Sequence, residues 1–197
     1  MTHSNTNIFL VRHGQTQWNK EKRWQGSQNS NLTSLGIKQA QQTKELIDEQ
    51  VIDFAYVSPL QRAQDTIELI LKDKNIKAIV LDDIRELNIG PWEGNFHEST
   101  QISHPLQYHN FWHEPESFSL DGAETFVELQ NRVVKSLDEL FFKHKGTNIL
   151  VVSHWISIKV AVAHYLEKEI SELPFLNNPK NAELIHLCDN GKKISIS

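Results

Sequence analysis

The stretch Ile8-Phe9-Leu10-Val11-Arg12-His13-Gly14-Gln15-Thr16-Gln17-Trp18-Asn19 carries the strongest signal in this chain. Four apolar residues lead to a glycine, a pattern that predicts a buried strand ending in a turn. Arg12 and His13 then lie at the carboxyl end of the strand, which faces the ligand-binding crevice in an open parallel sheet. A guanidinium matches phosphate or carboxylate oxygens, an imidazole titrates near neutrality, and Gly14 lets the backbone approach an anion. The stretch therefore predicts an oxyanion held against an imidazole.

A second predicted strand, residues 53–57, also ends in residues that suit an anion. Ser58 and Pro59 follow it, as expected for the N-cap and the first position of a helix. Arg62 falls in the first turn of that helix, where free N–H groups and the helix dipole already favour negative charge. A lone Arg-His-Gly motif is weak evidence, so this recurrence is what favours a functional site over a structural histidine.

Two more strand ends carry residues capable of acid–base chemistry. Residues 76–81 form a predicted strand, and Glu86 follows it in a loop rich in glycine and proline. Residues 148–153 repeat the apolar pattern of the first strand and lead directly to His154. Because ligands bind outside the carboxyl ends of parallel strands, we expect all of these side chains to share one pocket.

Helical apolar periodicity separates the predicted strands. It begins at Thr33 or Ser34 for the first helix, returns from Leu60 to Leu71, and is longest over residues 123–145. Residues 182–196 read as a final hairpin that turns at Asp189-Asn190-Gly191. This alternation predicts one α/β domain over residues 1–197: a three-layer α/β/α sandwich whose mainly parallel sheet has an antiparallel edge.

Residues 95–120 form the least regular part of the chain, with aromatic residues and histidines placed among prolines. A long insertion of this kind is often a lid or a substrate loop. Its aromatic side chains would line a pocket for an apolar part of the substrate, or they would pack together and hold the insertion in place. The sequence leaves both interpretations open.

The composition of the 197-residue chain argues against several classes of protein. A formal net charge of −5 gives no basic excess for nucleic-acid binding, and no apolar run is long enough for a membrane span. We expect no secretory leader, and the single cysteine, Cys188, cannot form an internal disulfide, so a cytoplasmic location is expected. Cys188 is expected to be buried and inert. The oligomeric state is open, with a homodimer among the options.

Two arginines beside an imidazole suit a phosphate monoester, which carries close to two negative charges because its second pKa is about 6. Arg12 and Arg62 would neutralise the non-bridging oxygens. His13 would attack phosphorus as a neutral imidazole and form a phosphohistidine that water later breaks. Glu86 would protonate the leaving alkoxide and then activate that water. Further hydrogen bonds to the phosphate are expected from two residues: Asn19 and His154.

Ordered motifs between Ile8 and Ala163 match a known family. They are Leu10–Asn19, Arg23 with Gln25-Gly26, Leu32-Thr33 with Gly36 and Gln39-Ala40, Ser58-Pro59-Leu60 with Arg62-Ala63 and Thr66, Arg85-Glu86 with Gly90 and Trp92-Glu93-Gly94, Gly122 with Glu124, and Val152-Ser153-His154. Together they resemble the histidine phosphatase superfamily, branch one, also called phosphoglycerate mutase-like. The resemblance implies that fold, the roles given above, and a reaction without metal or cofactor. It extends the expected phosphate-binding set to Gly14, Gln15, Gln25, Gly26 and Trp155.

The resemblance is closer to the phosphatases of the family than to its mutases. The mutases carry a longer segment between the acid and the second histidine, whereas the segment from Glu86 to His154 is short here. Gln25-Gly26 also resembles the phosphatase form of the early loop. Trp155 departs from the family, which usually has glycine after the second histidine, and its indole would narrow the pocket or support the leaving group. We therefore expect a phosphatase whose partner is a small phosphate monoester.

Three alternatives are kept open by the sequence. The first is a phosphomutase that uses a phosphorylated cofactor. The second is a non-catalytic module that binds phosphorylated ligands, in which Trp155 has abolished turnover while the arginines still bind phosphate. The third is a metal site at His109 and His113, which are four residues apart and would share a helical face.

Overall fold

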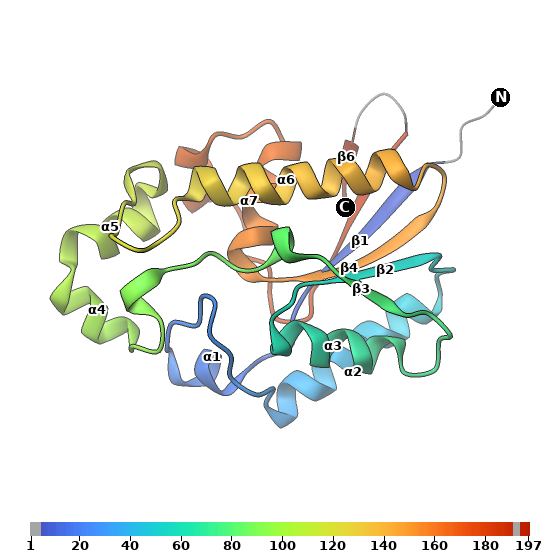
Figure 1. The fold of residues 1–197 in the computed structure, drawn as a ribbon, viewed down its shortest axis with the longest axis horizontal. Helices are drawn as coiled ribbons and strands as arrows, with labels where there is room; N and C mark the ends of the chain where they lie inside the picture. Colours follow the sequence, from blue (N-terminus) through green and yellow to red (C-terminus); the bar gives the residue numbers. More distant parts are fainter. Residues whose placement is uncertain (1–4, 191–193) are drawn as a thin grey trace.

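Within residues 5–190 and 194–197, which the computed structural model describes, six strands form a mixed sheet in the order β3-β2-β4-β1-β5-β6 (Figure 1). The strands are β1 (Thr6–Arg12), β2 (Phe54–Val57), β3 (Ala78–Val80), β4 (Asn148–Ser153), β5 (Leu184–Asp189) and β6 (Ile194–Ile196). Strands β1 to β4 pair in parallel, whereas β5 is antiparallel to β1 and β6 is antiparallel to β5. The prediction of a mainly parallel sheet with an antiparallel edge is confirmed.

Helices cover both faces of the sheet, as the three-layer prediction requires (Figure 1). The helices α2 (Ser34–Asp48) and α3 (Gln61–Leu71) lie on one face, and α6 (Phe126–Lys143) and α7 (Trp155–Tyr165) lie on the other. Shorter helical segments occupy the connections: α1 (Gln17–Glu21), η1 (Asp82–Ile84), η2 (Gly90–Trp92), α4 (His97–Ser103), α5 (Pro105–His113), η3 (Pro115–Ser117) and η4 (Ile170–Phe175). No helix in the described part of the chain combines the length and the apolar content that a membrane crossing requires.

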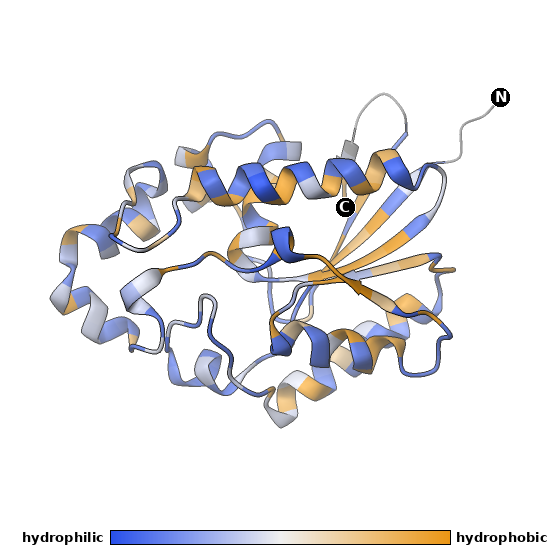
Figure 2. Cartoon of the chain, viewed as in Figure 1, coloured by the Kyte–Doolittle hydropathy of each residue, from blue (hydrophilic) through white to orange (hydrophobic). Residues whose placement is uncertain are grey.

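Alternation along β1 divides the hydrophobic core into two parts. Ile8 and Leu10 pack in the cluster with residues of α6 and α7, whereas Phe9 and Val11 pack in the cluster with residues of α2 and α3. Neighbouring side chains on a strand point to opposite faces, so an apolar run on a central strand serves both layers. In Figure 2 the apolar residues gather along the strands and on the helix sides turned toward them. Burial of each large apolar side chain contributes about 1.5–3 kcal/mol, so both layers hold β1 in place.

Strand register aligns the ends that carry the candidate site. Arg12 on β1 lies opposite Ser153 on β4, and Val57 on β2 lies opposite Val152 on β4. The residues that follow leave the sheet side by side: His13, His154 and Ser58. Segments far apart in the sequence therefore meet at one edge of the sheet.

The start of α3 differs from the sequence prediction. Ser58 and Pro59 are expected at its N-cap and first position, but the helix begins at Gln61, and its N-cap, Leu60, makes no side-chain capping bond. The Ser58 hydroxyl instead contacts His154, with Oγ and Nε2 2.6 Å apart. The prediction is wrong because Ser58 lies two residues before the N-cap: its Oγ accepts a hydrogen bond from the amide of Leu60 over 3.3 Å, and its hydroxyl contacts the imidazole of His154.

Segment 95–120 is more regular than the sequence predicts. The helical segments α4, α5 and η3 occupy most of it, and Pro105 stands at the start of α5, where its missing N–H group is tolerated. Both interpretations of the aromatic residues hold in part. Phe111 is buried against Trp24, with ring centroids 4.8 Å apart, and both Phe111 and Trp112 line the cavity of the candidate site. The assignment of this segment as a lid stays a prediction.

Smaller details also differ from expectation. Cys188 lies on β5 as expected, but it is half-buried rather than buried. The periodicity of the α2 sequence places Ile47 and Val51 on one apolar face, yet Ile47 is buried while Val51, beyond the end of the helix, is 76% exposed. The predicted turn at Asp189-Asn190-Gly191 includes Gly191, which lies outside the described residues, as does the polar N-terminal stretch from Met1 to Ser4.

Candidate active site

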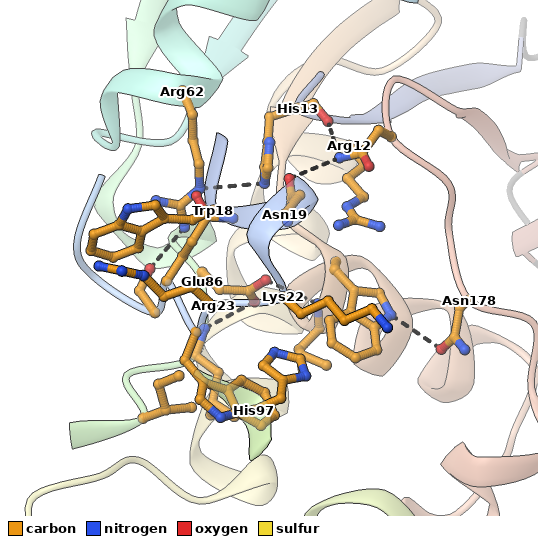
Figure 3. A pocket seen from close by; sticks show the side chains of 18 of the residues that line it. Arg12, His13, Trp18, Asn19, Lys22, Arg23, Arg62, Glu86, His97 and Asn178 are labelled. Atoms are coloured by element: carbon orange, nitrogen blue, oxygen red, sulfur yellow. Dashed lines mark hydrogen bonds between the residues drawn. The ribbon is translucent and has the colours of Figure 1, made fainter. Parts of the chain in front are cut away.

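A cavity of about 360 Å³ opens beside the carboxyl ends of β1 and β4 (Figure 3). The predicted site residues that line it are Arg12, His13, Asn19, Gln25, Gly26, Arg62, Glu86 and Trp155. His154 lies next to His13, with the ring centroids 5.2 Å apart, and its side chain is fully buried. The structure thus brings together residues from four strand ends around one cavity.

His13 is 2% exposed and has a defined protonation pattern. Its Nδ1 lies 2.8 Å from the Gly14 carbonyl oxygen, which can only accept, so Nδ1 carries the proton. Nε2 is then an acceptor, and the Arg62 Nε–H group donates to it over 3.3 Å. Burial and the charges of Arg62 and Arg12 hold the pKa of His13 well below its ordinary value of 6.5. The imidazole is therefore neutral at pH 7, with its lone pair on Nε2.

The two arginines of the cavity are held by backbone oxygens. Arg62 donates from Nη2 to the Gly26 carbonyl oxygen over 2.7 Å. Arg12 donates from Nη1 to the Pro179 carbonyl oxygen over 2.7 Å, and its buried Nε finds no hydrogen-bond partner among the described residues. Burial lowers the pKa of each guanidinium to about 10, while the charge of Glu86 opposes this shift. Both arginines therefore stay charged at pH 7, beside a neutral imidazole.

His154 presents a buried ring nitrogen that protein groups leave free. Its Nε2 contacts Ser58 Oγ, which already accepts a hydrogen bond from the Leu60 amide, so the hydroxyl proton can be donated to Nε2. The ring proton then lies on Nδ1, which is buried and has no partner in residues 5–190 and 194–197. Burial, followed by the charge of Arg62, lowers the pKa of His154 well below 6.5. A bound anion would satisfy this N–H group.

Glu86 is fixed at the N-terminus of α7. Its Oε1 accepts hydrogen bonds from the amides of Leu87 and Ser157, and its Oε2 accepts one from the Ile156 amide. The first N–H groups of a helix have no partner within the helix, so a carboxylate is a natural ligand for them. These bonds hold Glu86 in the lining of the same cavity as His13.

Arg132 on α6 supports Glu86, and no sequence motif indicates this residue. Arg132 donates to the carbonyl oxygens of Arg85 and Glu86 over 2.8 and 3.0 Å. Its Nε also pairs with Glu124 Oε1 at 2.6 Å, and Glu124 in turn accepts a hydrogen bond from the Asn88 amide. Glu124, together with Gly122, is one of the motifs that carry the family resemblance, so the sequence indicated a role for this carboxylate. Nothing in the motif indicates which cation Glu124 pairs with. The Glu124–Arg132 pair holds the loop that carries Glu86.

Gly14 and Gln15 are predicted phosphate ligands that do not line the cavity. The Gly14 amide donates to Thr66 Oγ1 and the Gln15 amide donates to Gln39 Oε1, both over 3.0 Å, so neither amide is free for an anion. A Cβ atom at position 14 would lie 2.5 Å from the carbonyl oxygen of Gly36. The structure thus corrects the reason for this glycine: it allows close contact with α2.

Asn19 and Gln25, by contrast, lie in the lining as predicted. The Asn19 Oδ1 atom accepts a hydrogen bond from the Thr16 backbone amide over 3.1 Å, and the Gln25 Oε1 atom accepts one from the Thr16 hydroxyl over 3.0 Å. With these oxygens engaged, the amide groups remain as the donors that each side chain can offer to a ligand.

Trp155 forms one wall of the cavity, in place of the usual glycine. Its indole lies near Trp112, with ring centroids 5.4 Å apart, and near Arg12, whose Cζ atom is 5.9 Å from the ring centroid. Asn178 Oδ1 accepts hydrogen bonds from Trp155 Nε1 over 3.1 Å and from Lys159 Nζ over 2.7 Å. These contacts fix the indole as part of the cavity wall.

The loop before β5 contributes residues that no motif indicated. Asn178 and Asn181 line the cavity, and Asn181 Nδ2 donates to the His13 carbonyl oxygen over 3.2 Å. They reach the site because β5 pairs antiparallel with β1, which returns the chain to the carboxyl end of β1. Asparagine is an ordinary residue of turns and loops, so the sequence held no signal for these positions.

The histidine pair considered as a metal site lies outside the cavity lining. His109 and His113 are neighbours on α5, with ring centroids 4.8 Å apart, and His109 Nε2 lies 3.7 Å from Glu114 Oε1. Among the residues that the structure describes, no three histidine, cysteine, aspartate or glutamate side chains are grouped so that they could hold a metal ion. The pair therefore lacks the ligand set of a zinc site.

The sequence as a whole matches the model of the histidine phosphatase superfamily (branch 1) over residues 8–197, so the chain belongs to this family. The resemblance inferred from the motifs is confirmed. Over 165 residues it is 30% identical to phosphoserine phosphatase 1 of Hydrogenobacter thermophilus, covering 84% of this chain and 78% of that protein. Over 162 residues it is 30% identical to the adenosylcobalamin/alpha-ribazole phosphatase of Escherichia coli K12, covering 81% and 78% of the two chains.

The fold is likewise that of solved phosphoglycerate mutase-like proteins. YhfR of Bacillus stearothermophilus superposes with a TM-score of 0.95 at 26% identity, covering 98% of this chain and 95% of that chain. Several other curated relatives are longer, and the chain spans 30% to 65% of their length. The relatives named above are phosphatases of small metabolites, which agrees with the prediction of a phosphatase-type member.

Proposed function

We propose that this protein hydrolyses a small phosphorylated metabolite through a phosphohistidine on His13, with Glu86 as the proton donor and without a metal. The observation that carries the proposal is the neutral His13 ring, whose Nε2 lone pair meets Arg62 in a cavity that Arg12 and Glu86 also line. A neutral nucleophile beside fixed positive charge is the arrangement that attack on a phosphate dianion requires.

In the first step the phosphoryl group of the substrate replaces the contact between Arg62 and His13. Arg12, Arg62 and the Nδ1–H group of His154 bind the non-bridging oxygens and neutralise their charge. His13 Nε2 forms a bond to phosphorus while the bond between phosphorus and the alcohol oxygen breaks. Glu86 gives its proton to that oxygen, so the product leaves as an alcohol and a phosphohistidine remains.

In the second step water enters the place of the alcohol. The Glu86 carboxylate takes a proton from this water while the oxygen forms a bond to phosphorus and the bond to His13 Nε2 breaks. Inorganic phosphate leaves, and Glu86 holds the proton for the next cycle. One carboxyl group therefore serves as acid and then as base.

The substrate class follows from the cavity and the relatives. A volume of about 360 Å³, of which the Trp155 indole forms one wall, suits a small metabolite. Relatives named for phosphoserine and for α-ribazole make small phosphate monoesters the substrate class proposed here. A phosphomutase is disfavoured because these relatives are named as phosphatases. We further propose that residues 95–120 act as a substrate loop; the cytoplasmic location and a homodimer stay predictions.

The test of this function is turnover of p-nitrophenyl phosphate and trapping of the phosphoenzyme. His13→Ala should lose more than about 1,000-fold in kcat and should trap no phosphoenzyme, whereas His109→Ala, a matched change at a histidine outside the cavity, should retain activity. Chelators should leave the wild type unaffected. Turnover in His13→Ala would refute the mechanism. Phosphate binding without turnover would favour the binding module, and transfer to a phosphoglycerate instead of phosphate release would favour the mutase.

A further inference from the structure

We propose that Lys22 binds a second anionic group, most simply a carboxylate, on the alcohol portion of the substrate. This inference rests on the proposed phosphatase function and deepens it, because it names the chemistry of the leaving group. None of the relatives or motifs considered above assigns a role to Lys22.

The described residues that line the cavity carry more positive charge than a phosphoryl group requires. The cationic residues are Arg12, Lys22, Arg23 and Arg62, and Glu86 is the carboxylate among them. His13 and His97 add no charge at pH 7, because burial lowers the pKa of both, that of His97 to about 4. A phosphate dianion is matched by Arg12 and Arg62. Two cations, Lys22 and Arg23, are then left on the side of the alcohol.

Arg23 already has partners for its guanidinium. Its Cζ atom lies 4.5 Å from the ring centroid of Phe96 and 5.3 Å from that of Trp18, so the group packs over both aromatic rings, although its Nε forms no hydrogen bond among the described residues. Its Nε also lies 3.6 Å from Glu21 Oε2, which offsets part of the charge. Arg23 thus contributes to the positive field of the cavity but is held in place by these neighbours.

Lys22, in contrast, is positioned by its backbone and leaves its ammonium group free. It is the C-cap of α1 in the left-handed conformation, with φ 55° and ψ 47°, and its carbonyl oxygen accepts a hydrogen bond from the His97 amide over 3.0 Å. Within residues 5–190 and 194–197 its Nζ forms no ion pair. In the view of Figure 3 its side chain extends over the cavity between His97 and Arg12. The ammonium is a compact point charge on a flexible stem, so it can reach a carboxylate placed at different depths in the cavity.

The size of the cavity limits how large this substrate can be. A volume of about 360 Å³ lies at the lower end of the range of about 300–1,000 Å³ that is usual for small-molecule sites. It therefore has room for a phosphoryl group and a short carbon chain that ends in a carboxylate. The substrate class inferred is a phosphorylated hydroxy acid or amino acid, rather than a phosphorylated neutral alcohol.

The experiment compares esters that differ only in the second charge. O-phosphoserine and O-phosphoethanolamine differ by one carboxylate, and 6-phosphogluconate and sorbitol 6-phosphate provide a longer pair. The wild type should show a higher kcat/KM for the acid in at least one pair. Lys22→Met should lower that ratio by about two- to fivefold, the usual range for an exposed ion pair. Lys22→Glu should reverse the preference in the serine pair, because phosphoethanolamine keeps its ammonium group.

Lys20→Met is the matched control, since Lys20 lies on the same short helix, is exposed, and does not line the cavity. It changes the net charge equally and should leave the ratio unchanged. Equal ratios in both wild-type pairs, or equal effects of Lys20→Met and Lys22→Met, would overturn the proposal. Turnover of p-nitrophenyl phosphate by the wild type separates these outcomes from a failure of the phosphatase function itself.

Discussion

Lowering the pH from 7.5 to 5.5 is expected to destabilise the folded protein through His13 and His154. Both side chains are buried, and burial together with the arginine charges holds their pKa values well below 6.5. In the unfolded chain each imidazole takes up a proton as the pH falls below its ordinary value of 6.5. The folded protein does not, so the unfolded state binds more protons and gains stability as the solution becomes acidic.

The size of this effect can be worked out for each histidine. Proton uptake by an unfolded-state imidazole of pKa 6.5 stabilises the unfolded state at pH 5.5 by about 1.4 kcal/mol relative to pH 7.5. His13 and His154 together should therefore cost about 3 kcal/mol over this interval. Domains of ordinary size have unfolding free energies of about 5–15 kcal/mol, so the loss is large enough to measure.

Urea unfolding at pH 7.5, 6.5 and 5.5, followed by the fluorescence of the five tryptophans, measures the pH dependence directly. Other groups also titrate, so the comparison is between the wild type and variants that lack one histidine. His13→Gln and His154→Gln should each reduce the loss between pH 7.5 and 5.5 by about 1.4 kcal/mol. Val152→Ala, a core change without a titrating group, should shift all three values equally. A pH dependence identical in wild type and both histidine variants would refute the reasoning.

Three further changes follow from contacts at the site. Arg132→Met removes the donor that holds the Glu86 loop and should lower kcat by about tenfold or more with less effect on KM; unchanged kcat on p-nitrophenyl phosphate would contradict this. Gly14→Ala forces a Cβ against the Gly36 carbonyl and should cost about 1–3 kcal/mol in urea unfolding; wild-type stability would show that α2 yields easily. Trp155→Gly removes a cavity wall and should raise kcat/KM for 1-naphthyl phosphate relative to O-phosphoserine; an unchanged ratio would show that the indole does not limit the leaving group.

The arrangement of strand ends was predictable from the sequence because it depends on simple periodicities. An apolar run ending at Arg12 and His13, repeated in the run ending at His154, is sufficient to predict two buried parallel strands. Once both strands belong to one sheet, their carboxyl ends must meet. The register of the two strands then places the two histidines side by side, because Arg12 pairs with Ser153 and each histidine is the next residue in its chain segment.

The choice of hydrogen-bond partners was not predictable in the same way. Ser58 has a sequence that suits a helix N-cap, but its hydroxyl bonds His154, which lies 96 positions away. The sequence suggests that Gly14 lets an anion approach the backbone, yet the atom that a Cβ at this position would meet is the Gly36 carbonyl oxygen. In each case the local sequence indicates which kinds of contact a residue can make. Which contact it makes in the structure depends on the residue that another helix or strand places next to it. Asn178 and Asn181 belong to a loop, where no periodicity exists to place them.

Arg12 and His13 are held by hydrogen bonds with the loop before β5, and this has a consequence for folding during synthesis. The Pro179 carbonyl oxygen holds the Arg12 guanidinium, and Asn181 holds the backbone of His13. Arg12 and His13 leave the ribosome more than 150 residues before the loop at Pro179 and Asn181 and the strand that anchors it. A nascent chain can therefore build β1 before it can complete the candidate site, which needs β5 to have emerged and paired. Catalytic activity should then arise only after the segment that contains β5 has been synthesised, which keeps shorter nascent chains inactive.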